Sequence, residues 1–454
     1  MKAPRTLAVA GITAALVAAE LVAGQVLAPD RRPPTGRQRS AADAAVVDPA
    51  AGAAPATLAE TERLIRVYET RSRTVRDAGE LTFLAQLYLQ RGRVSGDVTT
   101  YGQARAALQR ALAIAPSDQS ARTLLASTQA TEHNFSAALA SSRQVLATNP
   151  GDPAALAVAG DALLETGRYD QARATFAQLA RANPAGAGVL ARQARIAWLT
   201  GDIPAARALA ARATAAATTA GSFGAGLAFY PAFAGQLELE QGQYPVAATL
   251  YAEALTDAPG WHVALAGLGR AEAAQQHYDK AAMLLRQAVE VVPQPDYLAA
   301  LGDVLAAAGD RRGAQQQYDT VDFTGRLAAV NRQLFNRQLV QFDADHQLNR
   351  ARAVHLAQTE LAVRKDVYGW DALAWALLND GQVAPAREAA AHALALGSHD
   401  PRILYHAGMI AAAGQDPTRA RDLLGRALAI SPHFDPLQAP RARQTLATLR
   451  TVNP

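Results

Sequence analysis

The 454-residue sequence has no cysteine, three lysines and few aromatic side chains. Without cysteine there can be no disulfide, thiolate metal site, cysteine catalysis or lipid attached to a thiol. The lysines (Lys2, Lys280 and Lys365) stand in no Gly-x-x-x-x-Gly-Lys-Ser/Thr phosphate loop. The sequence pI is near 9.4, but no basic stripe with interleaved aromatic residues occurs. We therefore predict that the protein has no nucleic-acid partner.

Motifs of catalytic and metal sites are also missing from the sequence. Residues 267–269 (GLG) fall inside a helical pattern rather than after a strand, and residues 221–224 (GSFG) lack the Gly-x-Ser-x-Gly spacing. Three histidines spaced by seven residues are separated by an expected turn between helices: His392, His399 and His406. Residues 343–346 (DADH) fit a helix end better than a cation site. The sequence predicts a protein that is not an enzyme and has no cofactor or metal.

The sequence is rich in alanine and contains a repeat, whose clearest copy is LAVAGDALLETGRYDQARATFAQLARANP at residues 156–184. A small residue early in the second helical segment recurs every 33 to 41 residues, with Ala351 the weakest match: Ala104, Ala138, Ala172, Ala206, Ala247, Ala281, Ala314, Ala351, Ala386 and Ala420. A proline follows twelve residues later in six copies, and a Gly or Ala recurs in the first segment. Small residues allow two helices to approach closely, and proline ends the second helix.

This pattern resembles the tetratricopeptide repeat, a helix-turn-helix of 34 residues. The resemblance implies an all-α, right-handed superhelical solenoid of about ten units over residues 59–450, with a leading helix and a C-terminal capping helix. Each unit is expected to contact only its neighbours in one elongated array. Two insertions, at residues 92–100 and 214–227, predict long turns. Two stretches, at residues 84–116 and 360–382, are similar to a group of bacterial tetratricopeptide proteins that are exported or membrane-tethered.

The N-terminus reads as a targeting segment. Lys2 and Arg5 precede an apolar run within residues 1–28, which fits either a cleaved signal peptide or a retained membrane anchor. Residues 29–58 are rich in Pro, Ala, Gly and charge without periodicity, which predicts a disordered linker. Arginines flank both sides of the apolar run, so its orientation stays open. The Ala- and Arg-rich composition indicates a bacterial source.

In the resembling superhelices the first helix of each unit lines the concave face. Its inward positions predict a polar groove that contains, among others, Glu165, Arg195, Glu240, Arg270, Asp296, Asp303 and Arg402. The ninth and tenth units give the most aromatic and mixed set, which predicts a partner-binding patch: Tyr368, Asp371, Trp375, Asn379, Tyr405 and His406. The alternative is that Trp375 and Tyr405 pack between units.

These observations predict a non-enzymatic scaffold at the bacterial cell envelope that binds a protein or peptide in its concave groove. The extracytoplasmic side is favoured, with membrane attachment if the N-terminal segment is not cleaved. The alternative is an anchored, cytoplasm-facing regulator or assembly factor for a membrane complex. An enzyme built on a solenoid has no constellation of residues to support it.

Overall fold

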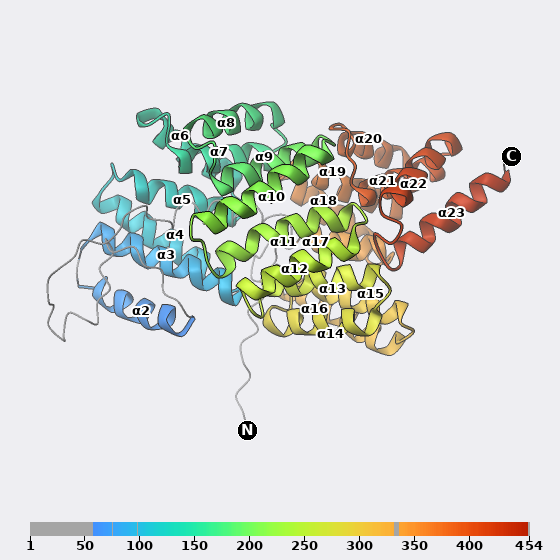
Figure 1. Cartoon of the computed structure of the whole chain (residues 1–454), viewed down its shortest axis with the longest axis horizontal. Coiled ribbons are helices and arrows are strands. Elements are labelled where there is room, and N and C mark those ends of the chain that lie inside the picture. Colours follow the sequence, from blue (N-terminus) through green and yellow to red (C-terminus); the bar gives the residue numbers. More distant parts are fainter. Residues whose placement is uncertain (1–57, 75, 98, 331–335, 453–454) are drawn as a thin grey trace, which may run out of the picture. The chain divides into compact units, whose positions relative to one another are not determined.

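The computed structural model describes residues 58–74, 76–97, 99–330 and 336–452. Within these residues it has 22 helices and no strand, which confirms the predicted all-α fold (Figure 1). The predicted targeting segment (1–28) and almost all of the predicted linker (29–58) lie outside the described residues. Among the helices that are described, none combines the length and the apolar character needed to span a bilayer.

Twenty of the helices form ten consecutive pairs, in agreement with the predicted number of units. The pairs are α3 (Ala78–Ser95) and α4 (Thr99–Ile114), α5 (Gln119–Thr131) and α6 (Phe135–Thr148), α7 (Pro153–Glu165) and α8 (Tyr169–Ala182), α9 (Ala187–Leu199) and α10 (Ile203–Thr219), α11 (Ala225–Glu240) and α12 (Tyr244–Asp257), α13 (His262–Ala274) and α14 (Tyr278–Val291), α15 (Pro295–Ala307) and α16 (Arg311–Val330), α17 (Asn336–Asp345) and α18 (Arg350–Val363), α19 (Val367–Asn379) and α20 (Val383–Ala393), and α21 (Pro401–Ala413) and α22 (Pro417–Ile430). The leading helix is α2 (Leu58–Arg71), and the closing helix is α23 (Gln438–Val452).

The chain divides into two compact units. Unit 1 holds the described residues up to Leu163 together with Ala174–Ala182, and unit 2 holds Leu164–Arg173 and the described residues from Asn183 onward. The core of unit 1 is built from apolar side chains of α2 to α5, and it includes an edge-to-face contact between Tyr68 and Phe83. The candidate site lies in unit 2.

Small residues sit where the two helices of a repeat cross, as the sequence predicts. A Cβ added to Gly160 in unit 1 would overlap the ring of Phe176, and one added to Gly408 in unit 2 would lie 2.8 Å from Cγ of Leu424. The alanines that mark the second helices are buried, with one exception. Ala351 is exposed and Ala353 is buried in its place, so the predicted register of the eighth repeat was wrong by two residues.

The two insertions mainly lengthen helices instead of forming long turns. Helix α3 continues to Ser95, and α10 continues to Thr219. The second insertion is rich in alanine, the best helix former, so its residues extend the helix until Gly221 and Gly224 take up positive φ angles. Only the short segment between α10 and α11 remains a turn.

Within unit 2, turns of early repeats contact loops of late repeats. Three turn glycines have positive φ and no room for a side chain: a Cβ on Gly167 would overlap the carbonyl oxygen of Lys365, one on Gly201 would lie 2.5 Å from Nδ1 of His399, and one on Gly242 would lie 2.5 Å from the carbonyl oxygen of Ile430. The turns after α7, α9 and α11 thus contact residues at or just after the ends of α18, α20 and α22. The expectation that each repeat contacts only its neighbours is wrong for unit 2.

Two tyrosines from the repeat motif hold these contacts together. The hydroxyl of Tyr169 accepts a hydrogen bond from the backbone N–H of Val367 (2.7 Å). The hydroxyl of Tyr244 accepts one from the N–H of His433 (2.8 Å) and lies 2.9 Å from Oγ of Ser431. Each hydroxyl joins residues nearly 200 positions apart in the chain. Figure 1 shows the early repeats of unit 2 in green and the late ones in orange and red.

Candidate functional site on the inner face of unit 2

Six charged side chains, here called the charge cluster, join the α7–α8 turn to the segment between α18 and α19: Glu165, Arg195, Arg337, Glu360, Arg364 and Asp366. Their side chains are at most 8% exposed. Glu165 accepts hydrogen bonds from Arg195 (2.5 Å) and Arg364 (2.9 Å). Arg337 binds Asp366 through both terminal nitrogens (2.7 and 3.1 Å). Every carboxylate of the charge cluster faces a guanidinium.

The charge cluster keeps Glu165 ionised. Burial alone would raise the pKa of Glu165, but Arg364 and Arg195 lower it to about 2. Asp366 also accepts a hydrogen bond from the N–H of Gly369 and so caps the start of α19 (2.8 Å). This arrangement fixes the α7–α8 turn on the late repeats and leaves no exposed charge for a ligand.

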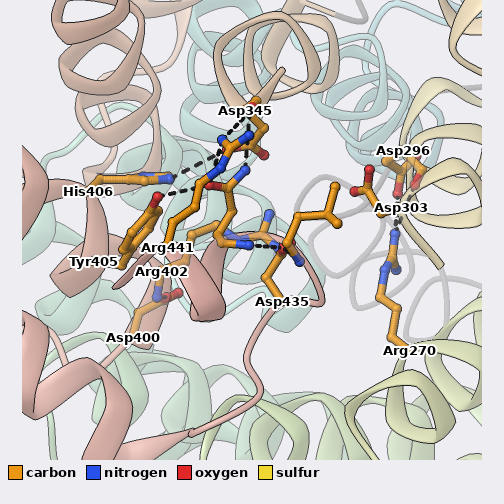
Figure 2. A network of polar contacts seen from close by, with 12 residues as sticks. Arg270, Asp296, Asp303, Asp345, Asp400, Arg402, Tyr405, His406, Asp435 and Arg441 are labelled. Atoms are coloured by element: carbon orange, nitrogen blue, oxygen red, sulfur yellow. Dashed lines mark hydrogen bonds and ion pairs between the residues drawn. The ribbon is translucent and has the colours of Figure 1, made fainter. Parts of the chain in front are cut away.

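A second set of polar side chains, here called the inner face, comes from the first helices of the repeats and the segments beside them. Consecutive first helices from α11 to α21 contact one another, so their side chains share a surface. Figure 2 shows most of this set. Its members are Glu240, Arg270, Asp296, Asp303, Asp345, Asp371, Asp400, Arg402, Tyr405, His406, Asp435 and Arg441.

One end of the inner face is an aromatic and acidic group. His406 lies with Nδ1 2.9 and 3.0 Å from the two carboxylate oxygens of Asp371, and its ring stacks on Trp375 with centroids 4.4 Å apart. The indole N–H of Trp375 donates to Asp345 (2.8 Å), which ties α19 to α17. The hydroxyl of Tyr405 donates to Gln438 at the start of α23 (2.8 Å).

The other end pairs its charges. Arg270 donates to Asp296 (3.1 Å), and Asp303 accepts hydrogen bonds from the hydroxyl of Tyr318 (2.9 Å) and from Nε2 of His346 (2.8 Å). Burial opposes the charge on His346, but the hydrogen bond to Asp303 raises its pKa to about 9. These carboxylates are therefore compensated, as those in the charge cluster are.

Between the two ends, carboxylates outnumber cations. Arg402 lies 3.9 Å from Asp435, and Asp345, Asp400 and Asp371 also raise its pKa against the effect of burial. Burial raises the pKa of Asp435 to about 6, and Asp303 and Asp345 add to the rise. Burial also raises the pKa of Glu240 to about 8, with Asp400 next in effect. Four aspartates therefore act on Arg402, while Glu240 keeps its proton near neutral pH.

Two buried atoms of the inner face near Arg402 have no hydrogen-bond partner. Oε2 of Glu240 is one, although Oε1 accepts from Gln236 (3.0 Å). Nε2 of His406 is the other, and it lies 3.9 Å from Oδ1 of Asp345, too far for a hydrogen bond. Buried polar atoms are normally paired, but Nε of Arg337 and Oε1 of Glu360 in the charge cluster are also without a hydrogen-bond partner, so such atoms alone do not mark a ligand site.

The structure brings five of the six residues of the predicted partner-binding patch into one connected group and separates Tyr368. Asp371, Trp375, Tyr405 and His406 are in mutual contact and at most 5% exposed. Tyr368 lies elsewhere on α19, where it forms a hydrogen bond with Trp198, and Asn379 donates to the carbonyl oxygen of Trp375 (2.9 Å). Burial of the rings favours packing between repeats, and the role of this set in partner binding stays a prediction.

Several residues of both sets were not found from the sequence. Arg337, Glu360 and Arg364 come from the eighth repeat, where the motif is weakest, and Asp366, Asp435 and Arg441 stand outside the inward positions of the first helices. Residues 343–346 form the predicted helix end. Within the described chain, no three His, Asp or Glu side chains converge as metal ligands would.

The fold and these surfaces define an all-α repeat protein whose paired helices enclose a polar face. Two family models described as tetratricopeptide repeat match the chain, one at residues 129–196 and 238–304 and the other at residues 372–433. The chain therefore contains tetratricopeptide repeats. No curated protein matches it in sequence.

Three solved structures illustrate the similarity. Human IFIT1, a dimer with PPP-AAAA, is 13% identical, covers 81% of this chain and 94% of its own, and has a TM-score of 0.44. A tetratricopeptide protein of Thermus thermophilus is 24% identical over 40% of this chain and 92% of its own (TM-score 0.35). PilW, a type IV pilus biogenesis factor, is 18% identical over 47% and 93% (TM-score 0.40).

Proposed function

We propose that this protein is a non-enzymatic, protein-binding scaffold of the bacterial cell envelope, and that unit 2 holds a partner polypeptide on its inner face. The observation that carries the proposal is the inner face itself, which gathers polar side chains from six successive repeats on one surface. Tetratricopeptide repeats typically act as protein-interaction scaffolds, which supports a polypeptide as the ligand.

The inner face is accessible to water at several points. The side chains of Arg402 and Arg270 are 40% and 31% exposed, whereas those of the charge cluster are at most 8% exposed. Arg441, in α23, is exposed. A partner can therefore reach Arg402 and the carboxylates around it, while the buried rings of Trp375 and Tyr405 support them from behind.

The proposed location of the protein at the cell envelope is inferred from its N-terminal segment. Residues 1–28 have the composition of an export signal or anchor, and we propose that they deliver unit 2 to the extracytoplasmic side. In the alternative, the segment anchors a regulator that faces the cytoplasm. A protease-accessibility assay on intact and permeabilised cells separates the two: cleavage in intact cells supports the first, and protection until permeabilisation supports the second.

Affinity capture from membranes with the native N-terminus intact tests the proposal. The bait is the full chain, compared with Arg402→Gln on the inner face and with Arg426→Gln on α22, whose side chain is similarly exposed (45%). We expect the full chain and Arg426→Gln to retain the same protein, and Arg402→Gln to retain much less while circular dichroism shows the same helical fold. Retention of no protein, or equal retention by all three baits, would contradict the proposal.

A further inference from the structure

A cleft of about 280 Å³ lies in unit 2 between α22 and the segment that joins α20 to α21. Its volume is near the lower end for ligand sites, roughly 300 Å³, which suits a small molecule. Six of its lining residues supply two cations, a carboxylate, a hydroxyl and two leucines: Leu394, Ser398, Arg419, Asp422, Leu423 and Arg426. None of these six residues belongs to the inner face.

The cleft carries a small positive charge. Arg419 and Arg426 are seven residues apart on α22, which is two helical turns, so they stand on the same side of the helix. Arg426 lies 3.5 Å from Asp422, whereas the exposed side chain of Arg419 has no ion pair within the described part of the chain. Two guanidinium groups and one carboxylate leave the cleft with a net charge of +1. A ligand with a single negative charge would balance it.

Ser398 adds a buried donor to the wall of the cleft. The residue is 7% exposed, and its Oγ accepts a hydrogen bond from the backbone N–H of Asp400 (3.1 Å). A serine hydroxyl can also donate one hydrogen bond, and this proton has no acceptor among the residues that the structure describes. Together with the unpaired Arg419, this donor favours a ligand that brings acceptor oxygens into the cleft.

The segment that carries Ser398 is held from its other side by the early repeats. Gln241 donates a hydrogen bond to the carbonyl oxygen of His399 (3.3 Å), and a Cβ on Gly201 would lie 2.9 Å from the carbonyl oxygen of Gly397. The wall of the cleft is therefore formed before any ligand arrives. A preformed site loses little free energy to ordering when it binds a small molecule.

We propose that this cleft binds a small carboxylic acid that carries an apolar group. Arg419 and Ser398 would hold the carboxylate, because a guanidinium presents its donors in a plane that matches two carboxylate oxygens. The apolar group would contact Leu394 and Leu423. A phosphate group carries about two negative charges near pH 7, which exceeds the charge of the cleft, and it makes no use of the leucines. The inference goes beyond the proposed function, since the ligand is a small molecule and not the partner polypeptide.

Ligand-detected saturation-transfer NMR on the full chain tests the proposal. The probes are N-acetylleucine and its amide, N-acetylleucinamide, which has the same apolar group without the charge, and inorganic phosphate serves as a competitor. We expect the acid to bind at least about tenfold more tightly than the amide, and phosphate to displace it poorly.

Two variants change the donors of the cleft, and a third is the matched control. Arg419→Gln removes an exposed guanidinium and should weaken binding of the acid at least about tenfold, while Ser398→Ala should weaken it about fivefold. The control is Arg312→Gln, which removes an exposed guanidinium from α16 outside the cleft and should change the affinity less than about twofold. Circular dichroism should show the native helical fold in all three variants.

Four outcomes would overturn the inference: no binding of the acid by the native chain, equal binding of the amide, displacement of the acid by phosphate at an equal concentration, or equal weakening by Arg419→Gln and Arg312→Gln. The capture experiment on the inner face is independent of these results, because it follows a protein and not a small molecule.

Discussion

The charge cluster and the region around Arg402 are built from the same residue types in the same unit, yet they differ in balance. In the charge cluster each carboxylate faces a guanidinium, and the pKa of Glu165 falls to about 2. Around Arg402 carboxylates are in excess, and the pKa of Asp435 rises to about 6. Balance indicates a structural connection, whereas the water-accessible Arg402 is the part of the inner face that a partner can reach.

The largest expected effect is in the charge cluster. Glu165→Gln leaves Arg195 and Arg364 buried without their common anion, so we expect the free energy of unfolding to fall by about 3–5 kcal/mol. Urea unfolding followed by circular dichroism measures the change, with Glu388→Gln on the exposed face of α20 as the control. A loss below about 1 kcal/mol would mean that the charge cluster does not hold the early and late repeats together.

Trp375 combines features of both regions: its ring is buried in the core, and its N–H donates a hydrogen bond to Asp345 of the inner face. Trp375→Ala removes a large core side chain, and we expect a loss of about 3 kcal/mol, near the lower end for such changes because the site is beside a wet surface. Thermal unfolding together with partner capture checks this. Reduced capture at an unchanged melting temperature would show that the ring is a binding anchor instead.

A pair of turn glycines tests whether the contacts between early and late repeats stabilise unit 2. Both Gly242 and Gly381 have positive φ, so alanine strains either backbone by about 1 kcal/mol. A Cβ on Gly242 would also meet Ile430, whereas one on Gly381 meets nothing within 4 Å. We expect Gly242→Ala to cost about 2–3 kcal/mol and Gly381→Ala about 1 kcal/mol. Equal losses in urea unfolding would show that the docked turn adds no stability.

The pH dependence of stability separates the two regions further. Burial and Asp400 raise the pKa of Glu240 to about 8, so the folded chain keeps a proton that the unfolded chain releases. This stabilisation is fully present below about pH 4.5 and is lost as pH rises through 8. We expect Glu240→Gln to be more stable than the native chain by about 1–3 kcal/mol at pH 9 and within about 0.5 kcal/mol near pH 4.5. Identical pH profiles would contradict an uncompensated Glu240.

The repeats and part of the site could be predicted from the sequence for a physical reason. The small residues at helix crossings are required by packing, so Gly160 and Ala172 identify a repeat, and the inward positions placed Glu165, Glu240 and Arg402 on one face. Contacts such as Glu165 with Arg364 depend on the curvature summed over five repeats, which no local pattern encodes. The burial of Trp375 and Tyr405 follows from those same contacts, which explains why their packing could not be decided beforehand.

The central claim is that the charge cluster holds the early and late repeats of unit 2 together, whereas the negative charge around Arg402 is not needed for folding. Urea unfolding of Glu165→Gln and of Asp435→Asn, each compared with the native chain, tests it most directly. Asparagine keeps the hydrogen bonds that Asp435 accepts from the N–H groups of Leu437 and Gln438. We predict that Glu165→Gln loses about 3–5 kcal/mol of unfolding free energy, and that Asp435→Asn is at least as stable as the native chain because burial disfavours the charge of Asp435. A less stable Asp435→Asn, or equal losses in both variants, would contradict the claim.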